Sequence, residues 1–558
     1  MSIAEELLDR GMITAEQFAE AMTLHKSEGL RVDRALVKLG CLSEDALLRI
    51  MSEQLSIPMV DLSKVSVDVE ILKNLPAKLV YRKRLVPVSQ HNGSLTVATS
   101  DPFDLYAFDE LRLLTGLEIR PVLASEDDIS KIIKANYGVG GDTIDEMMMS
   151  TDDLEVIKDS NGDTEDLLEM AQEASVIKLV NEIFLEALNE RASDIHIEPY
   201  EKDLKIRYRI DGVLHDASVP PQIRRFQAAI ISRIKIMASL NIAEKRLPQD
   251  GRIKLQAGGR QIDIRVSVIP MLFGEGIVMR LLDKANVLFT LPQLGMDETT
   301  FGTFKELIDR PHGIILVTGP TGSGKTTTLY AALQAIVSPE IKVLTVEDPV
   351  EYNLEGVNQI QVHPKINMTF AAGLRAILRH DPDVVMIGEI RDSETAEAAI
   401  QASLTGHLVL STLHTNDACS AATRLLDMGI EPFLVSSTLM AAMAQRLVRT
   451  ICSECKEAYK ADRENLPADF TPPDDLKLYR GAGCRKCRGT GYHGRTGVYE
   501  MMLVNEPIRQ LIMARRTAGE IVREARKIGL RLLREDGWDK VRHGITTPEE
   551  VTRNTSFA

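Results

Sequence analysis

The clearest chemistry in this chain lies in a glycine-rich segment between an apolar run and a helical pattern. "VTGPTGSGKTTTLY" fits the pattern Gly-x-x-x-x-Gly-Lys-Ser/Thr, with Lys325 and Thr326 as its last two members. In such a loop, backbone N–H groups surround phosphates, the ammonium reaches the β and γ oxygens, and the threonine hydroxyl takes one Mg²⁺ position. The sequence therefore predicts a site for ATP and Mg²⁺. Its nucleotide-binding residues are Gly319, Pro320, Thr321, Gly322, Ser323, Gly324, Lys325, Thr326 and Thr327.

Two carboxylates and a histidine follow later strand-like runs. Glu347 ends "VLTVE", Glu389 follows "VVMIG", and His414 follows "LVLSTL". Open parallel sheets bind ligands beyond the carboxyl ends of their strands. We expect Glu389 to hold the Mg²⁺ water shell, Glu347 to polarise the attacking water, and His414 to sense the γ-phosphate. Each residue alone has a structural reading, as a helix cap or a buried histidine, but their joint placement favours catalysis.

Two Cys-x-x-Cys pairs, "CSEC" and "CRKC", are separated by 28 residues. Four thiolates form a closed tetrahedral Zn²⁺ site without a position for catalysis. Unliganded thiols are the alternative. We expect Cys41 and Cys419 to be ordinary buried thiols. The predicted zinc ligands are Cys452, Cys455, Cys484 and Cys487.

Composition limits the classes of function. The chain has 558 residues, 26% of them charged, and a formal net charge of −15. This acidity argues against a motor that grips nucleic acid, which normally needs a surplus of lysine and arginine. No signal peptide is visible at the acidic start, and no uncharged run reaches the roughly 20 residues of a spanning helix. We expect a cytoplasmic protein that reaches a membrane only through partners.

The N-terminal part contains a weak repeat. Gly11 and Gly40 match at an offset of 29 residues, and Thr14 and Ser43 stand where helix N-caps are expected. Each unit reads as helix, glycine turn, helix. Farther on, residues 142–169 hold eleven acidic side chains and one basic one, which predicts a solvated linker.

A strand with strict alternation lies in the middle of the chain. "LKIRYRIDGVL" places Leu204 and Tyr208 on one face and Arg207 and Arg209 on the other, and an Asp-Gly pair then predicts a hairpin. "QIDIRVSVIP" repeats the alternation and places Arg265 on a polar face. After about residue 300, strands and helices alternate as in a parallel sheet.

Several segments resemble the secretion ATPase superfamily, the hexameric motors of type II secretion and type IV pili. The resemblance implies a PAS-like domain before a RecA-like domain, with nucleotide sites shared between neighbouring subunits. The segments are "GPTGSGKTT" (Walker A), "TVEDPVEY" (Asp box), "IGEIRD" (Walker B), "LSTLHTNDA" (His box), "ASDIHIEP", "RYRIDG" and "IAEKRLPQDGRI".

The resemblance also implies a division into domains. The expected parts are a partner-docking domain at 1–138 (helical repeat 1–55, α/β part 56–138), an acidic linker at 139–172, a PAS-like domain at 173–284, and a RecA-like domain at 300–558 that includes a zinc-binding subdomain (448–500) and C-terminal helices (503–558).

Further roles follow from the family. In this family the PAS-like domain supplies arginines to the γ-phosphate. The resemblance implies that Arg207 and Arg209 have this role here, with Arg246 and Arg252 as weaker candidates. The alternative is that these arginines only solvate an exposed sheet face. Some relatives bind cyclic di-GMP through Arg-Leu-Gly motifs, but this chain has "RVD" at 31–33 and a repulsive aspartate there. We therefore predict no cyclic di-GMP binding.

The leading interpretation is a hexameric ATPase that assembles a pseudopilus for type II secretion, docked by its N-terminal domain on an inner-membrane platform protein. "MGIEPFLVSSTLMAAMAQRLVR" resembles that branch most. Type IV pilus assembly is the alternative, and the tetracysteine element favours an assembly motor over a retraction motor. A RecA-like DNA translocase and a nucleotide-gated scaffold are the alternatives from other classes.

Overall fold

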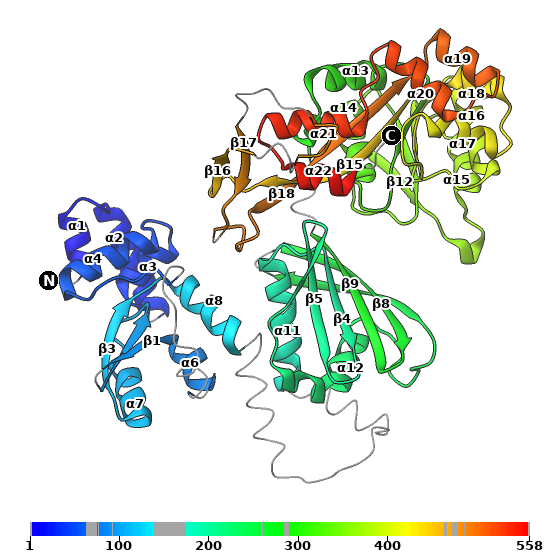
Figure 1. Cartoon of the computed structure of the whole chain (residues 1–558). Helices are drawn as coiled ribbons and strands as arrows, with labels where there is room; N and C mark the ends of the chain where they lie inside the picture. Colours follow the sequence, from blue (N-terminus) through cyan, green and yellow to red (C-terminus); the bar gives the residue numbers. More distant parts are fainter. Residues whose placement is uncertain are drawn as a thin grey trace. The chain divides into compact units, whose positions relative to one another are not determined.

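The computed structural model describes residues 3–28, 30–62, 75, 77–91, 93–137, 174–257, 260–283, 289–461, 466–470, 477–484 and 486–555. The described part divides into two compact units, one of residues 1–257 and 263–281, the other of 258–262 and 282–558 (Figure 1). The acidic linker predicted at 139–172 lies outside the described residues. No helix within the ranges above is long and apolar enough to cross a bilayer.

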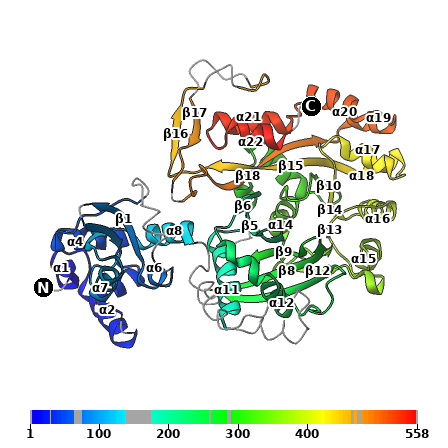
Figure 2. The same ribbon diagram turned by 60° about the horizontal axis from the view of Figure 1, so that its bottom comes forward.

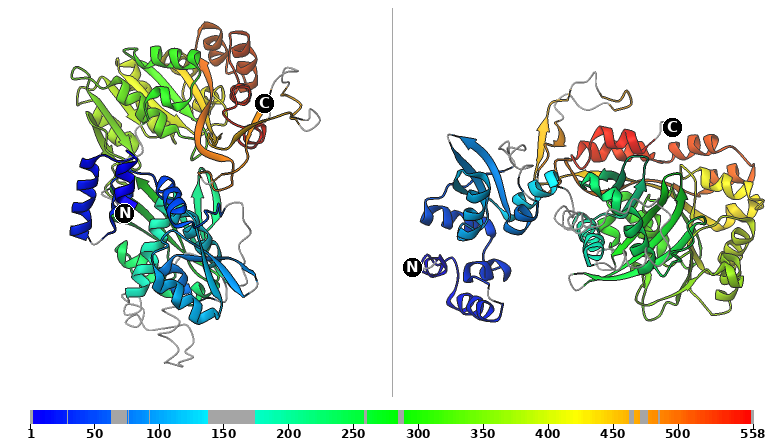
Figure 3. Two further views of the ribbon diagram at one scale, coloured as in Figure 1. Left: turned by 90° about the vertical axis from the view of Figure 1, so that its left-hand side faces the viewer. Right: turned by 90° about the horizontal axis from the view of Figure 1, so that it is seen from below.

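The first unit begins with the predicted repeat. Its helices are α1 (Ile3–Asp9), α2 (Ala15–Glu28), α3 (Val32–Lys38) and α4 (Glu44–Leu55), dark blue in Figure 3. Gly11 and Gly40 turn the chain with φ of 69° and 72°. Thr14 and Ser43 each accept a hydrogen bond from the backbone N–H three residues later, at 3.2 and 3.3 Å. The predicted caps and turns are confirmed.

A small α/β module follows. It contains α6 (Ala77–Lys83), β1 (Leu85–His91), β2 (Ser94–Thr99), α7 (Leu105–Thr115), β3 (Glu118–Leu123) and α8 (Glu126–Tyr137). Strand β2 pairs antiparallel with β1 and parallel with β3. Helix α7 ends at Gly116, which adopts the left-handed conformation with a φ of 67°.

The next module is a six-stranded sheet in the order β6-β5-β4-β9-β8-β7. Its elements are α11 (Ala174–Asn189), β4 (Asp194–Pro199), β5 (Leu204–Ile210), β6 (Val213–Asp216), η1 (Pro221–Phe226), α12 (Gln227–Met237), β7 (Gln249–Ala257), β8 (Arg260–Met271) and β9 (Gly274–Asp283). Leu204, Ile206 and Tyr208 are buried, and the Tyr208 hydroxyl donates to Glu186 of α11 at 3.0 Å. The apolar face of β5 therefore packs under α11 and leaves the arginines on the other face.

The second unit is built on a seven-stranded sheet in the order β12-β11-β13-β14-β10-β15-β18. The strands are β10 (Gly313–Thr318), β11 (Val343–Glu347), β12 (Val357–Gln361), β13 (Val384–Ile387), β14 (Leu408–Leu413), β15 (Leu439–Ile451) and β18 (Tyr492–Leu503). Only β18 runs antiparallel to its neighbour, and β15 and β18 form a long pair (Figure 2). The four predicted strands β10, β11, β13 and β14 pair in parallel.

Helices cover both faces of this sheet. They are α13 (Glu298–Ile308), α14 (Lys325–Ile336), α15 (Phe370–Ile377), α16 (Ser393–Leu404), α17 (Ser420–Asp427) and α18 (Pro432–Thr438), with short turns η2 (Leu291–Leu294) and η3 (Pro364–Ile366). Alternate residues of β10 enter two cores: Ile314 packs with α15 to α17, and Ile315 packs with α13 and α14. Burial on both faces explains why the strand reads as a continuous apolar run.

The chain ends in a small sheet and four helices. The sheet pairs β16 (Lys456–Tyr459) with β17 (Leu478–Gly481), and the helices are α19 (Glu506–Met513), α20 (Ala518–Lys527), α21 (Leu533–Arg542) and α22 (Pro548–Asn554).

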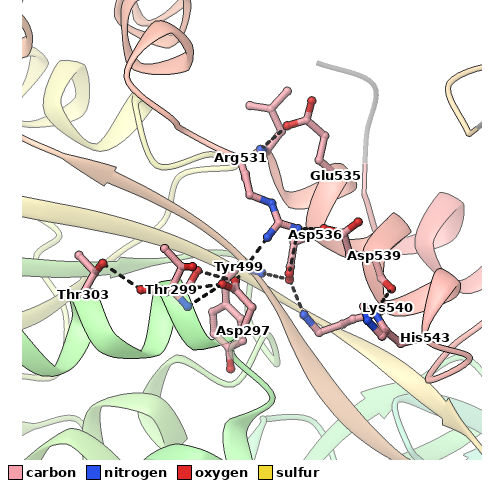
Figure 4. A network of polar contacts seen from close by, with 12 residues as sticks. Asp297, Thr299, Thr303, Tyr499, Arg531, Glu535, Asp536, Asp539, Lys540 and His543 are labelled. Atoms are coloured by element: carbon pink, nitrogen blue, oxygen red, sulfur yellow. Dashed lines mark hydrogen bonds and ion pairs between the residues drawn. The ribbon is translucent and has the colours of Figure 1, made fainter.

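Asp536 attaches α21 to the central sheet (Figure 4). Its carboxylate accepts from the backbone N–H of Tyr499 in β18 at 2.9 Å and from the Lys540 ammonium at 2.5 Å. Arg531 lies 3.7 Å from Asp297, the N-cap of α13. These polar contacts fix the C-terminal helices against the sheet that carries the phosphate loop.

Candidate nucleotide site

The phosphate loop, residues 319–326, joins β10 to α14 as predicted. Gly319, Gly322 and Gly324 have φ of 144°, 81° and 88°, values that side chains other than hydrogen rarely allow. A Cβ on Gly319 would lie 2.6 Å from the carbonyl oxygen of Gln445 in β15. The loop is therefore packed against β15, and α14 begins at Lys325, so that its N-terminal N–H groups face the loop.

The Lys325 ammonium folds back over this loop. It donates to the carbonyl oxygens of Gly319 at 2.8 Å and Pro320 at 3.1 Å. Burial lowers the pKa of Lys325, while the Glu389 carboxylate raises it and Arg446 lowers it further. No ion pair of Lys325 occurs within the described part of the chain, so a phosphate would supply the missing negative charge.

The structure brings Glu389 and His414 together. Their strands, β13 and β14, are neighbours, and Nε2 of His414 lies 3.2 Å from Oε2 of Glu389. The Thr412 hydroxyl donates to the carbonyl oxygen of Gly388 at 2.7 Å and fixes the two strand ends. Arg391 forms an ion pair with the other Glu389 oxygen. This pairing places the Walker B carboxylate and the His-box imidazole at one edge of the sheet.

Glu347 has a different environment from the one predicted. Its side chain is 3% exposed, and its carboxylate accepts from Thr345 at 2.5 Å, from Gln359 at 3.0 Å and from the Tyr330 hydroxyl. Burial, and next the Glu347 charge, raise the pKa of Tyr330. A carboxylate offers about four lone-pair sites, and three of them are taken by these donors, which leaves Glu347 little capacity to orient a water molecule. Glu347 therefore connects β11 with α14 and β12.

A second glutamate of the same segment is more accessible. Glu351 is partly exposed, although its Oε2 atom is buried, and its backbone N–H donates to the Tyr330 hydroxyl at 3.4 Å. It lies four residues after Glu347, which is the last residue of β11. Only Glu347 was predicted from the sequence, and Glu351 is distinguished from it by its greater exposure.

The predicted arginines lie in the six-stranded module. Arg207 forms an ion pair with Glu198 at 2.6 Å, and Arg209 lies 3.7 Å from Asp194. Arg246 is 87% exposed and pairs with Glu244 at 2.9 Å.

A different group of arginines lines a hollow of about 430 Å³ in the same module. These are Arg252, Arg265 and Arg280, with Asp194 and Asp250 beside them. Alternation in "QIDIRVSV" already placed Arg265 on this polar face, but nothing in the sequence indicated that three arginines would gather.

The four predicted cysteines come together. Their sulfur atoms lie within 4.8 Å of one another, with separations of 3.6 Å for Cys452–Cys484 and for Cys455–Cys487. A tetrahedral site with Zn–S bonds of about 2.3 Å has sulfur separations of about 3.8 Å, so the donor set fits Zn²⁺. Burial opposes ionisation, but backbone N–H groups of Cys484 and Gly491 bring the pKa of the Cys487 thiol down to about 7. The fit favours a structural zinc site.

The two remaining cysteines differ. Cys419 is fully buried, as predicted, and burial raises the pKa of its thiol. Cys41 is only partly buried, so the prediction of a buried thiol is wrong there. It lies in the turn after α3, where the chain bends at the surface.

Comparison with known proteins places this site in a family. The family described as "Type II/IV secretion system protein" matches residues 169–553. The chain belongs to this family. It is a P-loop ATPase, and the predicted resemblance and fold class are confirmed. A second family, described as "MshEN domain", matches residues 55–143.

Relatives of both branches align along the whole chain. The type IV pilus assembly ATPase PilB of Myxococcus xanthus is 46% identical, over 99% of each chain. The type II secretion system protein E of Xanthomonas campestris is 44% identical, over 100% of this chain and 98% of its own. The type II secretion system ATPase E of Vibrio cholerae is 52% identical, over 77% and 85%.

A solved structure supports the fold of the ATPase part. The ATPase DotB of Legionella pneumophila superposes with a TM-score of 0.51 at 22% identity, over 67% of this chain and 94% of its own. At this identity the likeness concerns the fold alone.

Proposed function

We propose that this ATPase acts as a homohexamer that drives pseudopilus assembly in type II secretion. The observation that carries its enzymatic part is the convergence of the phosphate loop with the Glu389–His414 pair at one sheet edge. The type II branch is supported by relatives of 50% and 54% identity over 81% and 70% of the chain. Type IV pilus assembly is the second candidate, favoured by the 46% identity to PilB over the full length.

In the proposed reaction, the phosphate loop binds ATP and the chain's own groups orient it. The amides of 319–326 and the Lys325 ammonium hold the β- and γ-phosphates, and Thr326 provides the hydroxyl for Mg²⁺. Glu389 would hold the water shell of Mg²⁺, and His414, in contact with Glu389, would sense the γ-phosphate. Bound Mg²⁺ supplies neutralisation of the developing phosphate charge.

The attacking water needs a carboxylate of the Asp box. We predicted Glu347 from the sequence, and its three donors favour a positioning role for it instead. We therefore propose Glu351 as the residue that polarises water.

Arginines from the PAS-like domain complete the site in this proposal. Arg207 and Arg209 remain the arginines predicted to reach the γ-phosphate of a neighbouring subunit. Arg265 and Arg280, which line the hollow, are the alternative candidates for this role. When two inactive proteins, one with an arginine replaced and one with Lys325→Ala, are mixed in one ring, ATPase activity returns only if the arginine acts on the site of a neighbouring subunit. Rings of Arg207→Ala or Arg265→Ala protein mixed with Lys325→Ala protein identify which arginine acts in trans.

The N-terminal domain is proposed to dock on an inner-membrane platform protein, which would hold the cytoplasmic ATPase at the membrane. Cyclic di-GMP is proposed not to bind. In support of this, the Arg31 guanidinium is engaged by Asp33 at 2.5 Å and Asp101 at 2.9 Å and stacks 3.9 Å from the Phe103 ring centre. Calorimetric titration with cyclic di-GMP tests this point.

The first test replaces Lys325 by Ala at the native locus and measures exoprotein release and surface piliation together. Lost secretion with intact pili supports the type II branch, and the reverse result supports pilus assembly. No effect on either would overturn the motor role. Hydrolysis stimulated by DNA would then favour the translocase alternative, against which the net charge of −15 argues.

A further inference from the structure

A second cation lies beside the phosphate loop. Arg446 belongs to β15, which pairs in parallel with β10 so that Thr318 stands opposite Ala444. Two residues farther on, Arg446 is level with the start of the loop. Its Nη1 lies 3.0 Å from the position that a Cβ on Gly319 would take. The guanidinium is therefore in contact range of the same loop residue whose carbonyl oxygen holds Lys325.

Within the described residues Arg446 forms no direct ion pair, although Glu500 and Asp417 are close enough to raise its pKa against the lowering by burial. Its guanidinium donates to the carbonyl oxygens of Gln445 and Asn416, both at 3.0 Å, and lies 3.4 Å from Oδ1 of Asn416. All three acceptors are neutral. Among the residues that the structure describes, neither Arg446 nor Lys325 forms an ion pair, whereas Arg391 nearby is paired with Glu389.

Two half-buried cations lie at one loop, and within the described residues neither forms a direct ion pair. Burial lowers the pKa of Arg446, although Glu500 and Asp417 raise it. Arg446 in turn lowers the pKa of Lys325. Buried charges are normally paired, and guanidinium groups bind phosphate with two parallel hydrogen bonds. Both cations approach Gly319, so both lie beside the loop that would bind the phosphates of ATP.

We propose that Arg446 is a phosphate-binding residue supplied by the same subunit as the phosphate loop. The guanidinium exchanges its neutral acceptors for oxygens of the terminal phosphate of ATP. This proposal rests on the proposed function, since it needs ATP at the phosphate loop. It adds a second ligand of the same subunit beside Lys325.

Occupancy of this position also affects the loop that follows His414. Arg446 holds the Asn416 carbonyl, and Glu500 of β18 accepts from the Ala418 N–H at 2.8 Å. When the guanidinium turns to phosphate, the Asn416 carbonyl loses its donor while Ala418 stays fixed.

The test measures nucleotide binding by the full-length protein. Fluorescent ADP and a fluorescent non-hydrolysable ATP analogue are titrated, with Mg²⁺, into wild type, Arg446→Gln and Arg446→Lys. We expect Arg446→Gln to bind the ATP analogue about ten- to a hundredfold more weakly and ADP nearly as tightly as wild type, because a charged hydrogen bond to the terminal phosphate is lost. Arg446→Lys keeps the charge and should recover part of the affinity.

Controls separate this inference from its alternatives. Arg523→Gln removes an exposed arginine that donates only to the Gly519 carbonyl, and it should change neither affinity. Equal weakening of ADP and ATP analogue by Arg446→Gln, or unchanged binding of both, would overturn the inference and leave Arg446 as a support for the loop. Failure of wild type to bind either nucleotide would instead refute the proposed function.

Discussion

The two glutamates of the Asp box give the most discriminating prediction. Replacing Glu347 by Gln keeps the volume but removes the charge that three donors share. Hydrogen bonds to a charged acceptor contribute roughly 1.5–3 kcal/mol each, and an unsatisfied buried polar group costs about 1–3 kcal/mol. The amide nitrogen of Gln must face at least one of those donors. We expect a loss of about 2–4 kcal/mol in the free energy of unfolding of the ATPase domain.

This loss is measurable as a change in melting temperature. For a domain of this size, about 1 kcal/mol corresponds to roughly 2–4 °C, so Glu347→Gln should lower Tm by roughly 5–15 °C. Glu351→Gln changes a partly exposed side chain and should leave Tm within about 2 °C. Its ATP turnover should fall by roughly a hundredfold or more, as expected for the loss of a general base.

The assay pairs differential scanning calorimetry with phosphate release at saturating ATP, for both variants and wild type. If Glu347→Gln melted like wild type and had lost turnover, the carboxylate would act directly on water and the reasoning from its hydrogen bonds would be wrong. Wild-type turnover in Glu351→Gln would likewise exclude Glu351.

Three further predictions follow from the same structure. Gly319→Ala should abolish binding of fluorescent ATP analogue in equilibrium titrations, because its Cβ would lie 2.6 Å from Gln445 O, whereas Gly302→Ala on the open face of α13 should bind normally. Chelation of zinc should release one Zn²⁺ per chain, measured by a colorimetric dye, and lower the melting temperature; Cys452→Ser should contain no zinc, and an unchanged Tm after zinc loss would contradict a structural site. Burial raises the pKa of Glu500 to about 7. Since the folded state holds this proton more tightly than the unfolded chain, stability from Glu500 is present below about pH 4.5 and decreases as pH rises toward 7. The fall in Tm between pH 5 and pH 8 should therefore be smaller in Glu500→Gln, and an equal fall in both proteins would show that Glu500 does not titrate in this range.

Features whose interaction partners lie close along the chain could be predicted from the amino-acid sequence. The phosphate loop is contiguous, and its glycines are required by local φ values at 319, 322 and 324. Likewise, Thr14 and Ser43 cap helices through N–H groups three residues away, and Leu204, Ile206 and Tyr208 alternate along one strand. Such features depend on periodicity and local hydrogen bonds, so they can be predicted from the order of residues along the chain.

The choice of polar side chains that serve the site depends on contacts between elements that lie far apart in the chain. The sequence places Glu347 where a catalytic residue is expected, yet Tyr330 and Gln359 from other elements donate hydrogen bonds to its carboxylate. The sequence gives no sign that Arg446 reaches Gly319, since they meet only because β15 lies beside β10. Strand β12, at the sheet edge, was also missed, because "VNQIQ" is polar and exposed in part. Burial and charge pairing depend on residues far apart in the chain, and strand order alone brings them together.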